Sequence, residues 1–274
     1  MVNIAYVLPI NSTIMKMRLF SCLLFLASAA WMNVFAQPTD EDLLKLFKGL
    51  RVADVSDGMD LVGLKDVGLM SPSIEALWKD TENFTHWVCG IAVTARYVPT
   101  NKVFPTNLSP EDYNRWVGNW YNTISPEPFV EHIKPGTFLV FDNAGDGDTG
   151  STGSANIMNW KSHGAVGLVS AGGVRDTDEI SKQKNPVYMD ISKRGRGIRP
   201  GRNEIESVQK PVVVGGVLVH PGDVIVADGD GVIVVPREKA VSVAEAAHRV
   251  LQGDKADRQA LYQKLGLPLD FTVQ

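Results

Sequence analysis

The spacing of apolar side chains predicts helices on both sides of a central region rich in strands. Apolar residues recur at helical spacing in residues 40–50, which begin with acidic residues, and a second helix is predicted for residues 52–61. From Pro236 onward one face is again apolar, and we expect Gly253 to divide this C-terminal helical tail, residues 236–274, into two helices. Because the tail is long relative to the core that it could cover alone, we expect it to pack on a neighbouring subunit.

Runs of small and β-branched residues predict short strands between these helices. Residues 88–97 form a continuous apolar run that is typical of a buried strand. Two Pro-Gly turns each precede a hydrophobic strand, one ending at Asp142 and the other at Asp228. Further strands are predicted at residues 186–189 and 211–219. Helices and strands mix along the chain, so the sequence predicts an α/β fold with a C-terminal helical tail.

Residues 99–128 differ from their surroundings in composition and in hydrophobic pattern. They combine prolines and asparagines with large aromatic residues and show no clean period, so we interpret them as an insertion over the core. The tyrosines and tryptophans of this segment are Tyr113, Trp116, Trp120 and Tyr121. Two interpretations are equally open: these side chains pack between subunits, as Trp and Tyr do at many interfaces, or they redirect the site to a larger substrate such as a sugar acid.

Residues 1–36 have the pattern of an export signal. Lys16 and Arg18 precede an apolar run at residues 19–30, and residues 34–36 suit signal-peptidase cleavage. A membrane anchor is the alternative, but the run is shorter than the roughly 20 apolar residues that a span needs. We therefore expect a periplasmic or secreted protein whose mature form has no membrane segment.

Cleavage of this signal would change the charge and the cysteine content. Loss of Lys16 and Arg18 from the 27 Lys and Arg residues leaves 25 against 31 Asp and Glu, a net charge of −6. This acidic balance argues against nucleic acid as a partner. Only Cys89 remains of the two cysteines, so stability must come from the core and not from disulfides.

Residues 153–176 carry the main candidate site. They predict a helix led by glycine, a buried strand and a glycine turn that presents Arg175 and Asp176. Arg175 supplies a permanently cationic fork and Asp176 a hard oxygen ligand, a pair that can hold a carboxylate beside a divalent ion. The helix start offers free backbone N–H groups that suit an anionic substrate group. These groups belong to Gly153, Ser154, Ala155 and Asn156.

Asp176 also has a purely structural interpretation. It stands at the N-cap position of a following helix with Glu179 three residues on, which is the spacing of a capping box. Spacing alone favours capping over metal ligation, although one carboxylate oxygen can cap while the other binds. The acidic, glycine-rich run at residues 142–153 lacks the final Glu of a calcium loop and the Gly-Lys-Ser/Thr ending of a phosphate-binding loop. No pair of histidines has the spacing of zinc ligands.

Several segments resemble, in the same order, the blocks of the RraA-like family, which contains class II 4-hydroxy-4-methyl-2-oxoglutarate aldolases and the regulator of ribonuclease activity A. The main block is residues 153–176, in which Arg175 falls 21 positions after Ser154. The resemblance covers nearly the whole chain after residue 36, apart from the aromatic insertion. The other matching segments are residues 52–59, 89–95, 134–136, 215–223 and 227–237.

This resemblance implies a swivelling β/β/α-type domain at residues 37–235, assembled as a trimer or hexamer with active sites between subunits. It implies a lyase of the aldolase or oxaloacetate decarboxylase type, which acts on a 2-oxo acid with Mg²⁺ or Mn²⁺ and without a Schiff base. Arg175 would bind the carboxylate or keto oxygen and Asp176 the metal, while the N–H groups of Ala155 and Asn156 would receive the substrate carboxylate. Cleavage beside a 2-oxo group leaves an enolate, whose charge a metal and an arginine stabilise.

Ser154 departs from the pattern of the aldolases it resembles, which have an acidic residue just after the glycine. A serine cannot serve as a base or as an anionic support for the metal. Asp146 or Asp148, a few residues upstream, are the candidates to replace it, and Asp254 is the candidate acidic residue from the tail of a neighbouring subunit. The alternative function is therefore a carboxylate-binding or regulatory protein without catalysis.

Overall fold

The computed structural model describes residues 38–193 and 195–274. The predicted export signal, residues 1–36, lies outside the described residues. Thr39–Gln274 forms one compact unit. Of the helices described in this unit, none combines the length and the apolar character that crossing a membrane requires.

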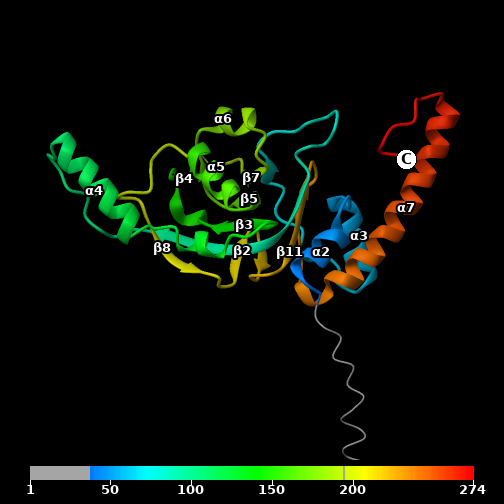
Figure 1. The fold of residues 1–274 in the computed structure, drawn as a ribbon, viewed down its shortest axis with the longest axis horizontal. Helices are drawn as coiled ribbons and strands as arrows, with labels where there is room; N and C mark the ends of the chain where they lie inside the picture. The colour runs from blue at the N-terminus through cyan, green and yellow to red at the C-terminus, as the bar shows by residue number, and fades with distance from the viewer. Residues whose placement is uncertain (1–37, 194) are drawn as a thin grey trace, which may run out of the picture. The chain divides into compact units, whose positions relative to one another are not determined.

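A mixed sheet forms the centre of this unit (Figure 1). Its strand order is β1-β7-β5-β3-β2-β11-β12, and β8 pairs with β2 off this path. Strands β2, β3, β5 and β7 run parallel, whereas the other strands join antiparallel. The strands are β1 (Ile74–Ala76), β2 (Val88–Pro99), β3 (Thr137–Asp142), β5 (Ala165–Ser170), β7 (Val187–Asp190), β8 (Asn203–Val208), β11 (Val224–Asp228) and β12 (Gly231–Val235).

The two ends of the sheet approach each other. Leu69 forms an isolated bridge to Ile233 of β12, and the Met70 N–H donates to the Val232 carbonyl at 2.9 Å. Strand β1 begins at Ile74, a few residues farther on, so the chain passes from the β12 edge to the β1 edge. One core cluster fills the inside of this curl and includes Phe138, Tyr188, Ile225 and Val234. The predicted α/β fold is confirmed.

Helices cover the outside of the sheet because each presents one apolar stripe. Helices α2 (Asp40–Phe47), α3 (Val52–Leu61) and α7 (Ala240–Leu265) share a core cluster with β11 and β12. Helices α5 (Ser154–Ser162) and α6 (Thr177–Lys182) bury Trp160 and Ile180 against β3, β5 and β7 (Figure 1). Short 3₁₀ turns are η1 (Pro128–His132), η2 (Ala144–Asp146) and η3 (Arg237–Lys239).

The C-terminal helix α7 is continuous, so the predicted break at Gly253 is wrong. A glycine inside a helix costs only about 1 kcal/mol relative to alanine, which is too little to end a helix flanked by good helix formers. After Ala247 no described residue of α7 is buried. Leu261 and Leu265 are 53% and 69% exposed. The packing of α7 beyond Ala247 on a neighbouring subunit stays a prediction.

The aromatic insertion contains a helix that the sequence did not predict, α4 (Pro110–Thr123). Ser109 caps it by accepting a hydrogen bond from the Asp112 N–H, and Pro110 occupies the first turn. The aromatics pack on one another: the rings of Phe104 and Trp116 lie 4.7 Å apart. Trp120 is buried and donates its indole N–H to the Asn203 carbonyl at 3.0 Å.

Residues 211–219 form a hairpin instead of the single predicted strand. Strand β9 (Val212–Val214) pairs antiparallel with β10 (Val217–Val219). Gly215 and Gly216 form the two-residue turn, and both have positive φ angles. Two adjacent residues with positive φ are what a tight type I′ hairpin turn requires, and glycine adopts them without steric cost.

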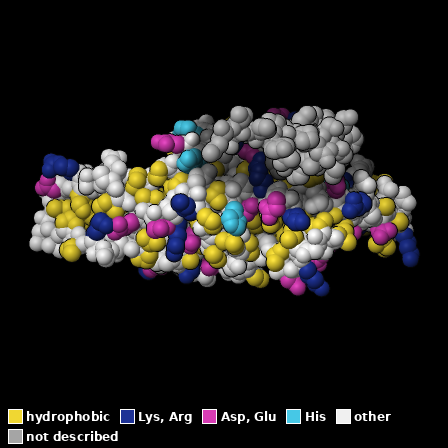
Figure 2. Space-filling model, turned by 90° about the horizontal axis from the view of Figure 1, so that it is seen from below, with side chains coloured by type: hydrophobic (Ala, Val, Ile, Leu, Met, Phe, Trp, Pro, Cys, Tyr) yellow, Lys and Arg dark blue, Asp and Glu magenta, His cyan; other side chains and the backbone are white. Residues whose placement is uncertain are grey.

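Charges of both signs are distributed over the described part of the face shown in Figure 2. On the face shown in Figure 2, Lys and Arg side chains are interspersed with Asp and Glu and with hydrophobic side chains. Neither sign dominates the described part of that face.

We predict that Gly58→Ala destabilises the fold, because α3 and α7 touch at this residue. A Cβ atom at Gly58 would lie 2.8 Å from the Ala247 backbone nitrogen and 2.9 Å from the Val243 carbonyl. Overpacking of this kind typically costs about 1–3 kcal/mol. Urea or thermal unfolding of the purified variant measures the loss.

Gly253→Ala is the matched control, since no atom lies within 4 Å of a Cβ built there. The same substitution in this exposed helical position should leave the stability unchanged or raise it by about 0.5–1 kcal/mol. Equal stability of the Gly58→Ala variant and the wild type would contradict the close helix contact.

Candidate functional site

The two halves of the predicted site meet because β3 and β5 are parallel neighbours. Phe141 at the end of β3 pairs with Ser170 at the end of β5, so both strands finish at the same edge of the sheet. The segment after β3 leads through β4 (Gly150–Thr152) to helix α5, and the segment after β5 leads through β6 (Gly173–Val174) to Arg175. Strands β4 and β6 pair in parallel, which brings the start of α5 beside Asp176.

Gly153 begins α5 in an extended conformation, and its N–H donates to the side-chain oxygen of Asn156 at 3.3 Å. The Ser154 N–H donates to Asp176 Oδ2 at 3.1 Å, and the Ser154 hydroxyl donates to the same oxygen at 3.4 Å. A Cβ atom on Gly153 would lie 2.6 Å from Asp176 Oδ2. Glycine is therefore required for the carboxylate to approach the helix start.

Asp176 does not form the capping box that its spacing with Glu179 favours. It occupies the N-cap position of α6, but its side chain makes no capping hydrogen bond there. Its backbone is left-handed, with φ 58° and ψ 42°, a conformation that Asp tolerates better than most residues. With this backbone the carboxylate lies against the first turn of α5 instead of the first turn of its own helix.

Arg175 lies against the other oxygen of this carboxylate, with Nε donating to Asp176 Oδ1 at 3.2 Å. Burial acts to raise the pKa of Asp176, but the hydrogen bonds from Arg175 and from the Ser154 N–H outweigh it and lower the pKa below its ordinary value. Asp176 is therefore an anion at neutral pH.

An open hollow of about 600 Å³ lies beside Arg175 and Asp176. Leu77, Met189 and Ile191 form its apolar wall, and Lys193 and Arg196 add further cationic side chains to its lining. Arg175 and Asp176 are 39% and 32% exposed, so both are accessible from solvent. The hollow thus has the size of a small-molecule site and an excess of positive charge.

The other acidic candidates have different surroundings. Asp146 is buried, and it accepts hydrogen bonds from the Ser151 hydroxyl at 2.7 Å and the Asn203 amide at 2.6 Å, while burial raises its pKa. Asp148 is exposed and pairs with Arg196. Asp254 lies on α7, where it accepts hydrogen bonds from Arg51 at 3.1 Å and Arg258 at 3.4 Å.

Asp176 is the one carboxylate in the lining of the hollow, as far as the described residues show. In that part of the chain no three His, Cys, Asp or Glu side chains gather as a metal site. The donor set still fits a hexacoordinate ion such as Mg²⁺, which keeps several water ligands and needs only one or two protein carboxylates. Asp176, whose pKa lies below its ordinary value, would supply one such ligand in ionised form.

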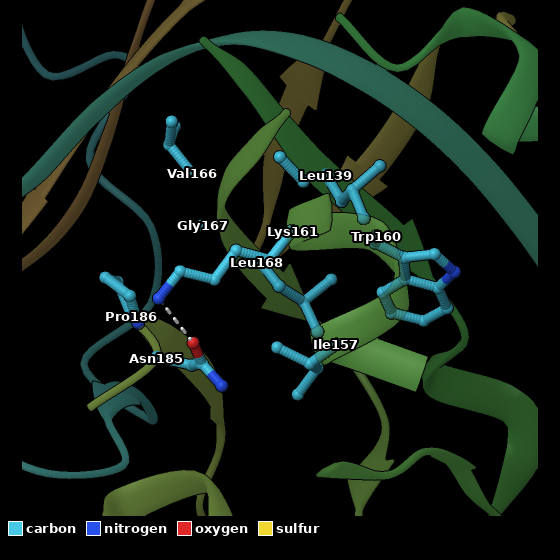
Figure 3. Close-up of a pocket in the computed structure, with 10 residues that line it drawn as sticks. Leu139, Ile157, Trp160, Lys161, Val166, Gly167, Leu168, Asn185 and Pro186 are labelled. Carbon is cyan, nitrogen blue, oxygen red and sulfur yellow. Dashed lines mark hydrogen bonds between the residues drawn. The ribbon is translucent and has the colours of Figure 1, made fainter. Parts of the chain in front are cut away.

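A second cavity, shown in Figure 3, lies between α5 and β5. Its volume is about 20 Å³, which is room for one water molecule. Its lining is mostly apolar, and the Lys161 ammonium donates to the Asn185 side-chain oxygen at 3.0 Å across it (Figure 3). This cavity is too small for a substrate.

Sequence reasoning missed the cationic and polar residues that surround the site. Lys193 and Arg196 stand in a run of glycines and basic residues, a composition that could have signalled an anion-binding loop. Glu127 accepts hydrogen bonds from Asn156 and Trp160 of α5 at 3.0 and 2.8 Å. No spacing rule connects Glu127 to α5, because it lies 29 residues upstream of Asn156.

Comparison with known proteins places these features in a family. A family model described as "RraA-like: Aldolase/RraA" matches residues 52–234. Protein DlpA of Legionella pneumophila is 25% identical over 213 residues, which are 77% of this chain and 30% of DlpA. The "Putative 4-hydroxy-4-methyl-2-oxoglutarate aldolase" of Halalkalibacterium halodurans is 30% identical over 46% of this chain and 59% of its own length. The chain thus spans less than two thirds of either relative.

Solved structures agree on the fold. An uncharacterized protein from Pseudomonas syringae pv. tomato superposes with a TM-score of 0.65 and 25% identity, covering 82% of this chain and 91% of that protein. RraAS2 of Streptomyces coelicolor, described as an unusual member of the RNase ES inhibitor RraA protein family, superposes with a TM-score of 0.62 and 24% identity over 82% and 98% of the two chains. The family match and the shared fold lead to one conclusion: the chain belongs to the RraA-like family.

Proposed function

We propose that this protein is a divalent-metal-dependent carbon–carbon lyase that acts on a 2-oxo acid. The observation that carries the proposal is the position of the Asp176 carboxylate, which lies between the Arg175 guanidinium and the first turn of α5 at the hollow. Two relatives that carry the name "Putative 4-hydroxy-4-methyl-2-oxoglutarate aldolase" support this reaction class.

Arg175 and the start of α5 would bind the substrate. The guanidinium carries its positive charge at every physiological pH and can hold a carboxylate through two parallel hydrogen bonds. The first intrahelical bond of α5 runs from the Ile157 N–H to the Gly153 carbonyl, so the N–H groups of Ala155 and Asn156 have no carbonyl partner within the helix. These groups suit the substrate carboxylate.

Asp176 would hold the divalent ion, Mg²⁺ or Mn²⁺. When bound, this ion would supply Lewis acidity toward the 2-oxo group of the substrate. In a 4-hydroxy-2-oxo acid the C4 hydroxyl loses its proton and becomes a carbonyl as the C3–C4 bond breaks, and the electron pair of that bond forms the enolate of pyruvate. Loss of CO₂ from C4 of oxaloacetate leaves the same enolate. Arg175 is positioned to stabilise this developing charge, and no lysine needs to form a Schiff base.

A second candidate function is carboxylate binding without turnover, within a homotrimer or hexamer of this chain. Ser154 favours it, because a neutral side chain stands where the aldolases it resembles have an acidic residue. Asp146 is buried with Ser151 and Asn203, whereas Asp148 pairs with Arg196, which lines the same hollow as Asp176. Asp148 therefore stays the better candidate to replace that acidic residue.

We predict pyruvate release from oxaloacetate or a 4-hydroxy-2-oxo acid in the presence of Mg²⁺ or Mn²⁺, and its loss when EDTA is added. Arg175→Ala and Asp176→Asn should each lower kcat/KM by about 10²–10³-fold, the cost of removing one stabilising group. Asp176→Asn keeps a residue that tolerates the left-handed backbone, so it isolates the effect of charge. A lactate dehydrogenase-coupled assay measures the pyruvate.

Arg115→Ala is the control for these variants, because Arg115 is an exposed residue of α4 that pairs only with Asp112 among its described neighbours. Its activity should equal that of the wild type. Turnover that EDTA leaves unchanged would overturn the metal-dependent mechanism, and trapping of a lysine adduct by borohydride would indicate a Schiff base instead. Pyruvate binding with no product from any of these substrates would support the second candidate.

Gly153→Ala should weaken Mn²⁺ binding by about tenfold or more, because its methyl group would occupy the space of Asp176 Oδ2. Electron paramagnetic resonance of Mn²⁺ titrations measures this without any need for turnover. Gly118→Ala on α4 has open space around its Cβ and should bind Mn²⁺ like the wild type. Unchanged binding by the Gly153→Ala variant would show that Asp176 does not hold the ion.

We also propose that the protein is exported, on the basis of Lys16, Arg18 and the apolar run at residues 19–30. Expression of the full chain in a bacterium should yield mature protein in the periplasm or medium, with Gln37 at its N-terminus. Mass spectrometry of each cell fraction identifies the terminus. Recovery of the chain in the cytoplasm with residues 1–36 intact would contradict export.

A further inference from the structure

A buried ion pair lies behind the start of α5. The Arg199 side chain is only 4% exposed, and its guanidinium donates to the Glu127 carboxylate. Arg199 also donates to the Tyr97 hydroxyl at 3.0 Å, and its guanidinium lies 4.8 Å from the centre of the Tyr121 ring. Moving Glu127 away would leave the Arg199 charge buried without its partner, which is costly. Arg199 therefore fixes the position of Glu127.

Glu127 connects this ion pair to helix α5. Its Oε1 accepts a hydrogen bond from the Asn156 amide at 3.0 Å, and its Oε2 accepts one from the Trp160 indole at 2.8 Å. Asn156 and Trp160 are four residues apart and therefore lie on the same face of the helix. One carboxylate thus holds two successive turns of α5.

Asn156 passes this constraint to Gly153, the N-cap residue of α5. Its amide nitrogen donates to Glu127, so its oxygen is left to accept the hydrogen bond from the Gly153 N–H. A carboxylate can only accept and a backbone N–H can only donate, which allows one orientation of the Asn156 amide. Gly153 in turn is adjacent to Ser154, whose N–H holds Asp176.

We infer that Glu127 is a positioning residue of the candidate site, acting through Asn156 on the N-terminus of α5. This inference rests on the proposed function of that helix start as the carboxylate-binding site. The competing explanation is that Glu127 only anchors the aromatic insertion, at whose end it lies. Two of the three groups that Glu127 accepts from belong to α5, which favours the positioning role.

A double-mutant cycle separates these explanations, with pyruvate in the presence of Mg²⁺ as the ligand and calorimetry as the readout. Glu127→Gln and Asn156→Ala should each weaken pyruvate binding by about tenfold, the effect expected for loss of a hydrogen bond to a charged group. The double variant should bind no more weakly than Asn156→Ala alone, because Glu127 acts through Asn156. Additive losses, or wild-type affinity of the Glu127→Gln variant, would overturn the inference.

Trp120→Phe is the matched control, since it removes the hydrogen bond from the insertion to the Asn203 carbonyl and leaves the bonds of Glu127 intact. It should lower the melting temperature without weakening pyruvate binding. Weakening equal to that of Glu127→Gln would favour the anchoring explanation. If Glu127→Gln does not fold, Glu127→Asp keeps the charge for Arg199 but shortens the reach to Asn156, and it should show the same tenfold loss.

Hydrogen exchange distinguishes failure of this inference from failure of the proposed function. If the wild type binds no pyruvate, the carboxylate site is wrong, but the positioning role still predicts faster amide exchange at residues 153–157 in the Glu127→Gln variant than in the Trp120→Phe variant. Mass spectrometry of peptides from this region measures the difference. Equal exchange in the two variants would overturn the role of Glu127.

Discussion

The parallel pairing of β3 with β5 is the constraint on which the candidate site depends. Two strands that run in the same direction finish at one edge of the sheet, so the segments that follow them must emerge side by side. Here one segment supplies the start of α5 and the other supplies Arg175 and Asp176. The short β4–β6 pair continues this arrangement beyond the main sheet. It sets the distance between the start of α5 and Asp176. Residues more than 20 positions apart thereby become hydrogen-bond partners.

The sequence predicted the elements whose signals are local. Helix α3 matches its predicted bounds, and β2 and the glycine-led α5 appear where the apolar patterns place them. The predicted secondary structure was wrong in two segments, at Gly253 and in residues 99–128. Gly253 was expected to break a helix, but its ordinary helical backbone costs little among its alanine-rich and charged neighbours. In residues 99–128 the mixture of prolines and aromatics concealed the helical period of α4, whose Ser-Pro start is itself a local signal.

The proximity of Arg175 and Asp176 to the start of α5 was predicted from the sequence, but their geometry was not. The left-handed backbone of Asp176 decides which helix receives its carboxylate, and no spacing rule reveals that conformation. The contact between Glu127 and Arg199 joins residues 72 positions apart and depends on the sheet that brings β2 and β8 together. Such contacts follow from tertiary structure, where periodicity and motif spacing carry no information.

The aromatic insertion leaves and rejoins the core beside residues 202–205, at the start of β8. The Thr100 N–H donates to the Arg202 carbonyl at the entry, and the Ile205 N–H donates to the Ile124 carbonyl at the exit. Because the ends of the segment are already adjacent, a longer or shorter loop between them changes the closure entropy by only about 0.6 kcal/mol per doubling of length. The tip of the insertion can thus diverge in evolution, or be replaced by design, provided that the buried Trp120 and the α5-binding Glu127 at its return to the core are retained.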